Sequence, residues 1–345
     1  MAVIISLTAD WEGYPTSTTR RFVEVRRRLD EAAGGSVPFT HFICPAYWLN
    51  GCKGVTDNLE GAIRPDDEVA LHVHCRKDLL DKTGVTFKER PKLTPWSAMQ
   101  GHDVALGEYP LTDIATILDY SRGLLRQELG REVSGFRCGA WMSSDDVLRA
   151  LIECGFTYDC SALPPALVGG INIDPWVTSL RELWGEIRSL NQSTKNQQRI
   201  QACQKIETVT QPFTVTIDGK TLREIPNNGA LSDYVDAKQM KVAYDTLKTQ
   251  AGLRCLNIGC HMDNPFGDPL VEFLTALKLD FVQGGCRLMT VAKADAAYCE
   301  GSLPAAPVGS GDGSVVRAAS PVSTRASVGN SAQAQLSSNI DQHPM

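Results

Sequence analysis

The sequence predicts an α/β fold, a distorted barrel in which parallel strands alternate with helices. Short apolar runs alternate with amphipathic segments along most of the 345 residues, which is the pattern of a parallel sheet with helical crossovers. Neither a GxGxxG motif nor a GxxxxGKS/T motif occurs, which disfavours an open nucleotide-binding sheet. Ionisable residues follow several of the apolar runs directly, as they do at the strand ends of a barrel.

The first half of the chain is a regular series of strands and helices. The run AVIISLTAD is typical of a buried strand, and the segment after it places Phe22, Val25 and Leu29 at helical spacing before two glycines. A Thr-Asp pair marks the start of a later periodic segment. We expect helices at 16–35, 57–66, 110–130 and 143–155, and strands at 2–10, 39–48, 68–75, 133–141 and 157–162.

The second half contains an irregular segment before the pattern returns. Residues 161–215 include the amide-rich run SLNQSTKNQQRIQ, so we expect an insertion or a long loop there. After it, we expect an extended segment at 222–228, helices at 236–251 and 268–279, strands at 254–261 and 280–285, and a last ordered segment at 287–298.

The chain divides into one large domain and a tail. Residues 1–302 have enough apolar content for a single core, with the insertion around 161–215 inside it. From about residue 303 the composition changes to Ala, Gly, Ser, Pro and Val without periodicity. Such a segment cannot bury enough apolar surface to offset its chain entropy, so we expect 303–345 to be a disordered, low-complexity tail.

Charge and targeting signals narrow the class of partner. The formal charge of −6, from 34 basic and 40 acidic residues, gives no basic field for nucleic acid or an anionic membrane. The N-terminus resembles no signal peptide and no apolar run approaches the ~20 residues that span a bilayer, so we expect a cytoplasmic protein. The 11 cysteines form no CxxC pair and are expected to be buried thiols rather than disulfides.

Two of the six histidines lie one residue apart, in EVALHVHCRKDLL. Alternate residues of a strand point to the same face, so His72 and His74 can reach one object. Two histidines at this spacing can also be a polar edge or core residues bonded to carbonyl groups, because His-x-His lacks the specificity of a four-ligand zinc pattern.

Polar residues at other predicted strand ends favour the functional interpretation. Asp10 and Glu12 follow the first strand, Arg137 lies in GFRCGAW, and His261 follows LNIGC. Each residue taken singly has a structural explanation, but their coincidence at one barrel rim predicts a site. Carboxylates and neutral imidazoles suit Zn²⁺, which can acidify a water and polarise a carbonyl. The pattern therefore indicates an amide or ester hydrolase.

These segments resemble four motifs of the polysaccharide deacetylases with a NodB homology domain, also called carbohydrate esterase family four. ISLTADWE is similar to the first motif, DDEVALHVHCRKDLL to the second, GFRCGAWMSSDDVLRALIECGFTYDCSA to the third, and LNIGCHMDNP to the last. The resemblance extends over about residues 3–295, without the insertion. It implies a distorted (β/α) barrel of about seven parallel strands, in agreement with the fold predicted above.

The resemblance also implies a role for each residue of the site. Asp10 would be the catalytic base, Arg137 the residue that orients it, and His261 the general acid, with Asp233 as the acidic partner of that histidine. The metal ligands would be Glu12, His72 and His74, holding Zn²⁺, or alternatively Co²⁺ or Ni²⁺. We expect Trp11 and Trp141 to contact the substrate.

Three positions depart from the common motifs. Trp11 stands where a second aspartate is usual, so Glu12 becomes the metal ligand, as in relatives with Asp-x-Glu. The second histidine motif usually has histidines four apart, and Arg76 occupies that position here, so His74 replaces the missing ligand. If His74 instead points away, only Glu12 and His72 remain. Cys138 replaces a proline whose role is backbone shape.

We therefore expect a metal-dependent hydrolase that removes an N-acetyl group from a carbohydrate or a related acetamide. Two alternatives stay open: an allantoinase-like cyclic-amide hydrolase of the same fold, and a catalytically degenerate saccharide-binding barrel. The second alternative would use tryptophans as stacking platforms, including Trp176 and Trp184. In each case the expected partner is a small molecule or an oligosaccharide, and neither nucleic acid nor membrane.

Overall fold

A computed structural model provides the structure of the chain. It describes residues 2–12, 19–49, 59, 61–89, 101, 103–164, 167, 206, 208–261, 267–301 and 316–317. Most of the segment 161–215 and of the predicted tail therefore lies outside the described residues, so the prediction of disorder for the tail stays a prediction.

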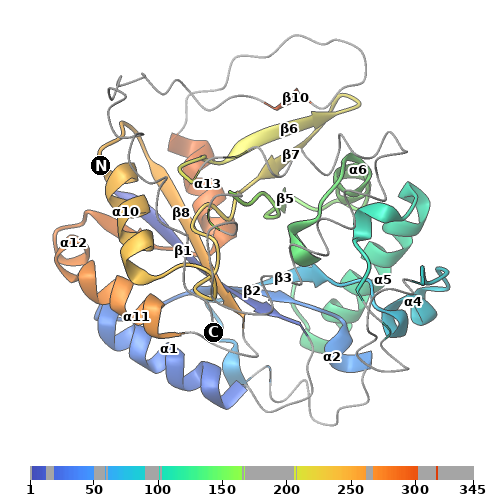
Figure 1. The fold of residues 1–345 in the computed structure, drawn as a ribbon, viewed down its shortest axis with the longest axis horizontal. Helices are drawn as coiled ribbons and strands as arrows, with labels where there is room; N and C mark the ends of the chain where they lie inside the picture. The colour runs from blue at the N-terminus through green and yellow to red at the C-terminus, as the bar shows by residue number, and fades with distance from the viewer. Residues whose placement is uncertain are drawn as a thin grey trace, which may run out of the picture.

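The strands form one mostly parallel sheet (Figure 1). Their order is β10-β6-β7-β5-β4-β3-β2-β1-β8, with β9 paired to β1. The strands are β1 (Val3–Trp11), β2 (Phe39–Ile43), β3 (Glu68–Val73), β4 (Gly135–Cys138), β5 (Tyr158–Asp159), β6 (Phe213–Ile217), β7 (Lys220–Glu224), β8 (Arg254–His261), β9 (Cys286–Leu288) and β10 (Val316–Arg317). Neighbours from β8 through β1 to β5 and β7 are parallel, which confirms the predicted α/β class.

Helices cover the outside of this sheet. In Figure 1, α1, α10 and α11 lie together on one side, whereas α4, α5 and α6 lie together on another. The helices are α1 (Thr19–Ala33), α2 (Ala46–Leu49), α4 (Lys77–Thr83), α5 (Leu111–Leu129), α6 (Asp145–Glu153), α10 (Ala237–Lys248), α11 (Gly267–Ala276), α12 (Lys278–Val282) and α13 (Val291–Gly301). Short 3-10 helices cover Leu106–Glu108 and Gly139–Trp141. Helices from opposite ends of the sequence thus pack together, since α1 contacts α11.

The segment 225–232 joins the two ends of the parallel sheet. At its start, the amide of Ile225 donates a hydrogen bond to the carbonyl of Asp159 in β5 (2.8 Å). Further along, the amide of Gly229 donates to the carbonyl of Asn257 in β8 (2.9 Å), and the amide of Gly259 donates to the carbonyl of Ala230 (2.9 Å). Because one segment bonds to both ends, the strands close into a distorted barrel.

Three predicted strands need correction. The segment 133–141 is a strand only over Gly135–Cys138, because Gly139–Trp141 forms a 3-10 helix. The segment 280–285 is not a strand: its start lies in α12, and β9 begins only at Cys286, because Gly284 takes a left-handed conformation (φ 71°) that ends the helix. The predicted strand 39–48 ends at Ile43, since Pro45 has no amide for the ladder and immediately precedes α2.

A hairpin at the end of the predicted insertion was not anticipated. β6 and β7 pair antiparallel around Asp218 and Gly219, which both have positive φ (51° and 76°). Asp-Gly between runs of alternating hydrophobicity is a strong hairpin signal, so the sequence did carry this information. β6 begins inside the segment 161–215, and β10, within the predicted tail, pairs antiparallel with it.

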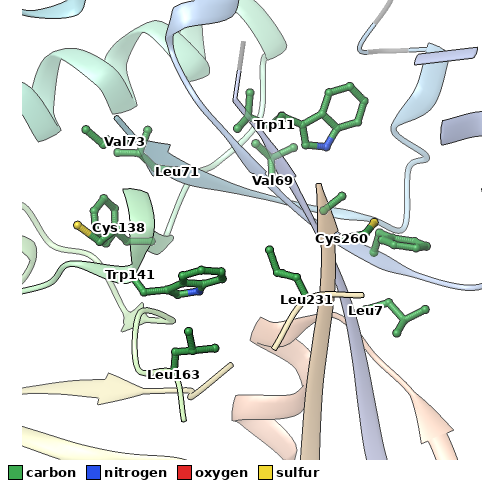
Figure 2. Close-up of a cluster of buried hydrophobic side chains, with 14 of the residues drawn as sticks. Leu7, Trp11, Val69, Leu71, Val73, Cys138, Trp141, Leu163, Leu231 and Cys260 are labelled. Atoms are coloured by element: carbon green, nitrogen blue, oxygen red, sulfur yellow. The ribbon is translucent and has the colours of Figure 1, made fainter. Parts of the chain in front are cut away.

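One large apolar cluster fills the space within and around the barrel. Figure 2 shows part of it, with side chains from β1, β3 and β8 and from the loops at the strand ends. The described cysteines are all free and mostly buried, as expected. Among the described residues, no helix combines the length and the hydropathy needed to cross a membrane.

Candidate active site

The predicted site residues lie where the strands of the barrel end. Asp10 belongs to β1 and Glu12 follows it, and because alternate strand residues share a face, both carboxylates point the same way. In the register of the sheet, Asp10 is opposite His261, and His72 is opposite Arg137. The sheet therefore brings groups from β1, β3, β4 and β8 to one rim.

Asp10 and Arg137 form a buried ion pair. Arg137 Nη1 lies 2.5 Å from Asp10 Oδ1 and 3.0 Å from Thr8 Oγ1, and the guanidinium stacks over the ring of Phe42 at 4.0 Å. Its Nε donates to the carbonyl of Cys160 (3.3 Å). Burial opposes the charge on Arg137, but Asp10 holds its pKa above the ordinary value. The guanidinium of Arg137 is thus held from several directions, and its position fixes that of the Asp10 carboxylate.

Glu12, His72 and His74 form a group with the composition of a metal site. One ligand atom of each lies within 4.8 Å of the others. His72 Nε2 is 3.0 Å from His74 Nε2, and His74 Nε2 is 3.4 Å from Glu12 Oε1. His74 thus points toward the shared face, in place of the alternative in which it turned away. Arg76, at the usual second-histidine position, is fully buried near Asp78 and is not a member of this group.

The donor set of this group fits a divalent cation. His72 Nδ1 lies 2.9 Å from the carbonyl of Arg137, so it carries the hydrogen and leaves a lone pair on Nε2. His74 Nδ1 lies 2.6 Å from Asp103 Oδ2 and so carries the hydrogen. When the ring of His74 is neutral, its Nε2 therefore also has a lone pair. Two nitrogen lone pairs 3.0 Å apart repel each other unless a proton or a cation lies between them. Imidazole nitrogens with a carboxylate are typical ligands of Zn²⁺.

Asp103 is a residue of this site that the sequence analysis missed. It lies 29 residues beyond His74, outside the four motifs and outside every predicted element. A lone acidic residue in an irregular stretch carries no pattern that would indicate a role. Only the folded chain brings its carboxylate to His74.

His261 contacts two carboxylates. Its Nδ1 lies 3.3 Å from Asp233 Oδ2, and its Nε2 lies 3.2 Å from Glu12 Oε1. Asp233 Oδ2 also accepts a hydrogen bond from the backbone amide of His261 (3.1 Å). The structure therefore brings Asp233 and His261 together, as the sequence suggested. The Nε2 atom of His261 faces the carboxylate of Glu12.

The pKa of His72 is shifted down, whereas the pKa values of His74 and His261 are shifted up. Burial lowers the pKa of His72 to about 4, so this ring is neutral at pH 7. For His74 and His261, burial also acts against the charge, but Asp103 and Glu12 in the first case and Asp233 and Glu12 in the second raise the pKa well above 6.5. Despite its burial, Glu12 has a pKa well below its ordinary value because His74 and His261 are close.

The two tryptophans predicted to contact substrate have different positions. Trp141 is 7% exposed, and its ring lies 6.0 Å from that of Tyr234, which is in turn 6.2 Å from the ring of His261. Figure 2 shows Trp141 among Cys138, Leu163 and Leu231. Ala140 and Trp141 both have positive φ (51° and 55°), so strain at this turn sets the direction of the indole.

The prediction for Trp11 is wrong. Trp11 is fully buried, donates from Nε1 to His41 Nδ1 (3.0 Å), and packs edge-on against Phe22 and Tyr47. It alternates with Asp10 and Glu12 along β1, so it points out of the barrel into the packing beneath α1. Trp176 and Trp184 lie outside the described residues.

Gly139 makes room for the ring of His74. A Cβ at this position would lie 2.6 Å from the carbonyl oxygen of Val73 and 2.9 Å from His74 Nδ1. We expect Gly139→Ala to lower the free energy of unfolding by about 1–3 kcal/mol and to weaken metal binding, because the backbone of β3 and the imidazole must shift. Thermal unfolding and a metal titration would measure the two effects.

Gly123→Ala is the matched control for this prediction. Gly123 lies in α5, where an added Cβ meets nothing within 4 Å. This variant should gain about 0.5–1 kcal/mol from helix propensity and bind metal as the wild type does. If Gly139→Ala behaved like Gly123→Ala, the close packing of Gly139 against His74 would have no energetic consequence.

Comparisons with known proteins place the fold. No protein-family model matches the chain, and neither does any curated protein sequence. Among solved structures, the chain is similar to a Mycobacterium smegmatis protein assigned as a polysaccharide deacetylase, with 11% identity, a TM-score of 0.51, and coverage of 89% of this chain and 95% of that one. The Puue allantoinase matches at 11% identity with a TM-score of 0.48, over 86% of this chain and 90% of that one.

A third structural match is the Xyl-CE4 domain of a multidomain xylanase from the hindgut metagenome of Trinervitermes trinervoides, at 12% identity with a TM-score of 0.41. It covers 87% of this chain and 92% of that domain. At identities this low, structural similarity establishes the fold and nothing finer. The chain therefore has the distorted (β/α) barrel fold of the polysaccharide deacetylases, as its four motifs predicted.

Proposed function

We propose that this chain is a metal-dependent hydrolase that removes an N-acetyl group from a carbohydrate or a related acetamide. The observation that carries the proposal is the combination of a buried Asp10–Arg137 pair and an Asp233–His261 pair at one rim with a three-ligand group. Amide hydrolysis needs a proton acceptor for the attacking water and a proton donor for the departing nitrogen, and these two pairs supply one of each.

Glu12, His72 and His74 would hold the metal ion. A bound divalent cation supplies Lewis-acid chemistry, acidifying water and polarising the acetyl carbonyl. Zn²⁺ suits two imidazoles and a carboxylate best, and Co²⁺ or Ni²⁺ accept the same ligands. His72, neutral at pH 7 because burial lowers its pKa to about 4, needs to lose no proton to bind.

Asp10 is the proposed general base. Its Oδ1 is held by Arg137, which fixes the orientation of the carboxylate, so Oδ2 is the oxygen that would receive the proton of the attacking water. Arg137 is itself held by Thr8 and Cys160, so the carboxylate cannot turn freely. Asp10 follows the pattern of a base positioned by its neighbours before substrate arrives.

His261 is the proposed general acid. Asp233 accepts the hydrogen of its Nδ1 and, with Glu12, favours the protonated imidazole. Nε2 faces the metal group and is the atom that would donate a proton to the departing amine. The side chain of His261 is 23% exposed, so a substrate entering from solvent can reach it.

Trp141 and Tyr234 support a carbohydrate substrate. Both rings are largely buried. The ring of Trp141 contacts that of Tyr234, which contacts the ring of His261, so the two aromatic residues offer apolar surface beside the proposed acid. Aromatic faces bind the C–H surfaces of sugar rings, while the small acetyl methyl needs only a narrow apolar site.

Metal content and acetate release, measured together, test this proposal. Purified wild type, His74→Ala and, as a histidine-to-alanine control, His343→Ala would be analysed for bound metal and then incubated with a panel of N-acetylated sugars. We expect about one metal per chain and acetate release in wild type and in the control. We expect His74→Ala to lose both, because two ligands hold a metal weakly.

Each contrary result has a defined meaning. Wild type that binds no metal and releases no acetate, even with added Zn²⁺ or Co²⁺, overturns the proposal. Hydrolysis of a cyclic ureide without acetate release would replace it with the allantoinase-like activity. Sugar binding without turnover would replace it with a binding protein.

A further inference from the structure

Strand β3 fixes the position of His72 but ends before His74, so the strand alone does not orient both imidazoles. His72 is fixed by β3 and by its Nδ1 contact to the carbonyl of Arg137. His74 lies one residue beyond the end of β3, where no ladder holds its backbone in place. A ligand at this position needs a further constraint, because a freely rotating imidazole can present either nitrogen.

Asp103 supplies such a constraint. Its Oδ2 lies 2.6 Å from His74 Nδ1, and both side chains are largely buried, at 14% and 7% exposure. An acceptor at this position requires hydrogen on Nδ1, so the other nitrogen is presented to Glu12 and His72. The two rings then stand nearly perpendicular, with centroids 4.7 Å apart.

Asp103 is itself held on both sides. Before it, Gly101 has positive φ (60°), and an added Cβ there would lie 3.0 Å from the ring of Phe87. After it, the 3-10 helix Leu106–Glu108 begins, and a Cβ on Gly107 would lie 2.8 Å from Ser144 Oγ. The segment that carries Asp103 is therefore packed against two parts of the fold, which makes its carboxylate a fixed reference point for His74.

We propose that Asp103 is a positioning residue that makes His74 a metal ligand. The common motif has its second histidine four residues after the first, where this chain has Arg76. Here His74, held in orientation by Asp103, takes the place of that histidine. The inference rests on the proposed metal site. Asp103 acts through His74 and touches neither metal nor substrate. Outer carboxylates of this kind set the tautomer and the orientation of a ligand imidazole, and their loss costs 10- to 100-fold in metal affinity.

The test compares Zn²⁺ affinity in full-length variants by competition with a chelator. We expect Asp103→Ala to bind Zn²⁺ about 10- to 100-fold more weakly than wild type. Asp103→Asn should lose less, because the amide oxygen still accepts from Nδ1 although it carries no charge. Asp81→Ala is the matched control, because Asp81 lies on α4 and pairs with Lys77 at the surface, so its loss should leave the affinity unchanged.

A second readout needs no metal. Nitrogen-15 NMR of the imidazoles, recorded at a pH high enough for the ring of His74 to be neutral, should show hydrogen on Nδ1 in wild type and a mixture of tautomers in Asp103→Ala. Thermal unfolding identifies a variant that fails to fold, and in that case Asp103→Asn is judged by the same two measurements.

The outcomes separate this inference from the proposed function. Asp103→Ala with wild-type Zn²⁺ affinity and an unchanged His74 tautomer overturns the role of Asp103, even if the protein releases acetate. Wild type that binds Zn²⁺ but releases no acetate removes the proposed function and leaves the role of Asp103 standing if the variant binds weakly. Wild type without Zn²⁺ affinity overturns both.

Discussion

Asp10→Asn is expected to lower the rate of acetate release by about 10³-fold while leaving metal content unchanged. Asparagine has nearly the shape of aspartate but cannot accept a proton at neutral pH. Asp10 is not a member of the group formed by Glu12, His72 and His74, so the metal should remain. Steady-state acetate release and metal analysis on the same preparation would measure both effects.

Loss of Asp10 also leaves Arg137 as a buried, uncompensated charge, so reduced activity can come from reduced stability. The double variant Asp10→Asn with Arg137→Met separates the two causes, because replacing both partners of a buried pair with neutral groups is often close to neutral for stability. We expect the double variant to unfold closer to wild type than Asp10→Asn does, yet to stay inactive. Activity within about tenfold of wild type in Asp10→Asn would exclude Asp10 as the base.

Asp67→Asn is expected to lower the free energy of unfolding by about 3–5 kcal/mol. The fully buried carboxylate of Asp67 accepts from both Nη atoms of Arg26, from the backbone amides of Phe39 (2.9 Å) and Arg64 (2.7 Å), and from His41 Nε2 (3.1 Å). It thereby ties the start of β3 to β2 and α1. An amide would leave the charge of Arg26 in the interior without a carboxylate to compensate it, although the carbonyls of Ala62 and Val37 still accept from its guanidinium.

Asp66→Asn is the natural control, since Asp66 is the preceding residue and is exposed. Its effect should stay within about 0.5 kcal/mol. Urea unfolding of the three proteins at pH 7 measures the difference. Equal stabilities of the Asp66 and Asp67 variants would show that the hydrogen-bond set of Asp67 contributes nothing to the fold.

The same carboxylate predicts a pH dependence. Although burial acts in the opposite direction, His41 and Arg26 lower the pKa of Asp67 below its ordinary value of 3.8. Its contribution to stability is therefore fully present above about pH 4 and is lost as the pH falls toward the lower pKa of the folded state. The stability difference between wild type and Asp67→Asn should be constant from pH 7 to pH 5 and should shrink below pH 4. A difference that grew on acidification would contradict this assignment.

His41 adds a slope at higher pH. Burial lowers its pKa below 6.5, although Asp67 acts in the opposite direction. Trp11 Nε1 donates to His41 Nδ1, so the neutral ring carries its hydrogen on Nε2, toward Asp67. Between pH 6.5 and its lower pKa in the folded protein, only the unfolded chain binds a proton at this residue, so stability falls as the pH is lowered through this range.

The sequence was most informative where local pattern and chemistry coincided. The alternation of strands and helices and the placement of Asp10 and Glu12 on one face of β1 follow from local periodicity, whereas the order of the motifs came from the resemblance to the polysaccharide deacetylases. The prediction for Trp11 failed because a motif neighbour was treated as a site neighbour, although alternation along β1 sends its side chain to the other face. The prediction of a strand at 280–285 failed because a short apolar stretch next to glycines fits a strand and a helix end equally well.

The amino-acid sequence by itself determined the fold class, most strand positions and the identities of the ionisable groups at the rim, because each depends on residues close together in the chain. Only the tertiary structure decided which of these groups meet. Arg137 on β4 reaches Asp10 on β1, although β3 and β2 lie between them in the sheet, because the sheet curves into a barrel and the guanidinium crosses its interior. Asp103 reaches His74 for the same reason: contacts between distant segments depend on closure and packing, which no local pattern encodes.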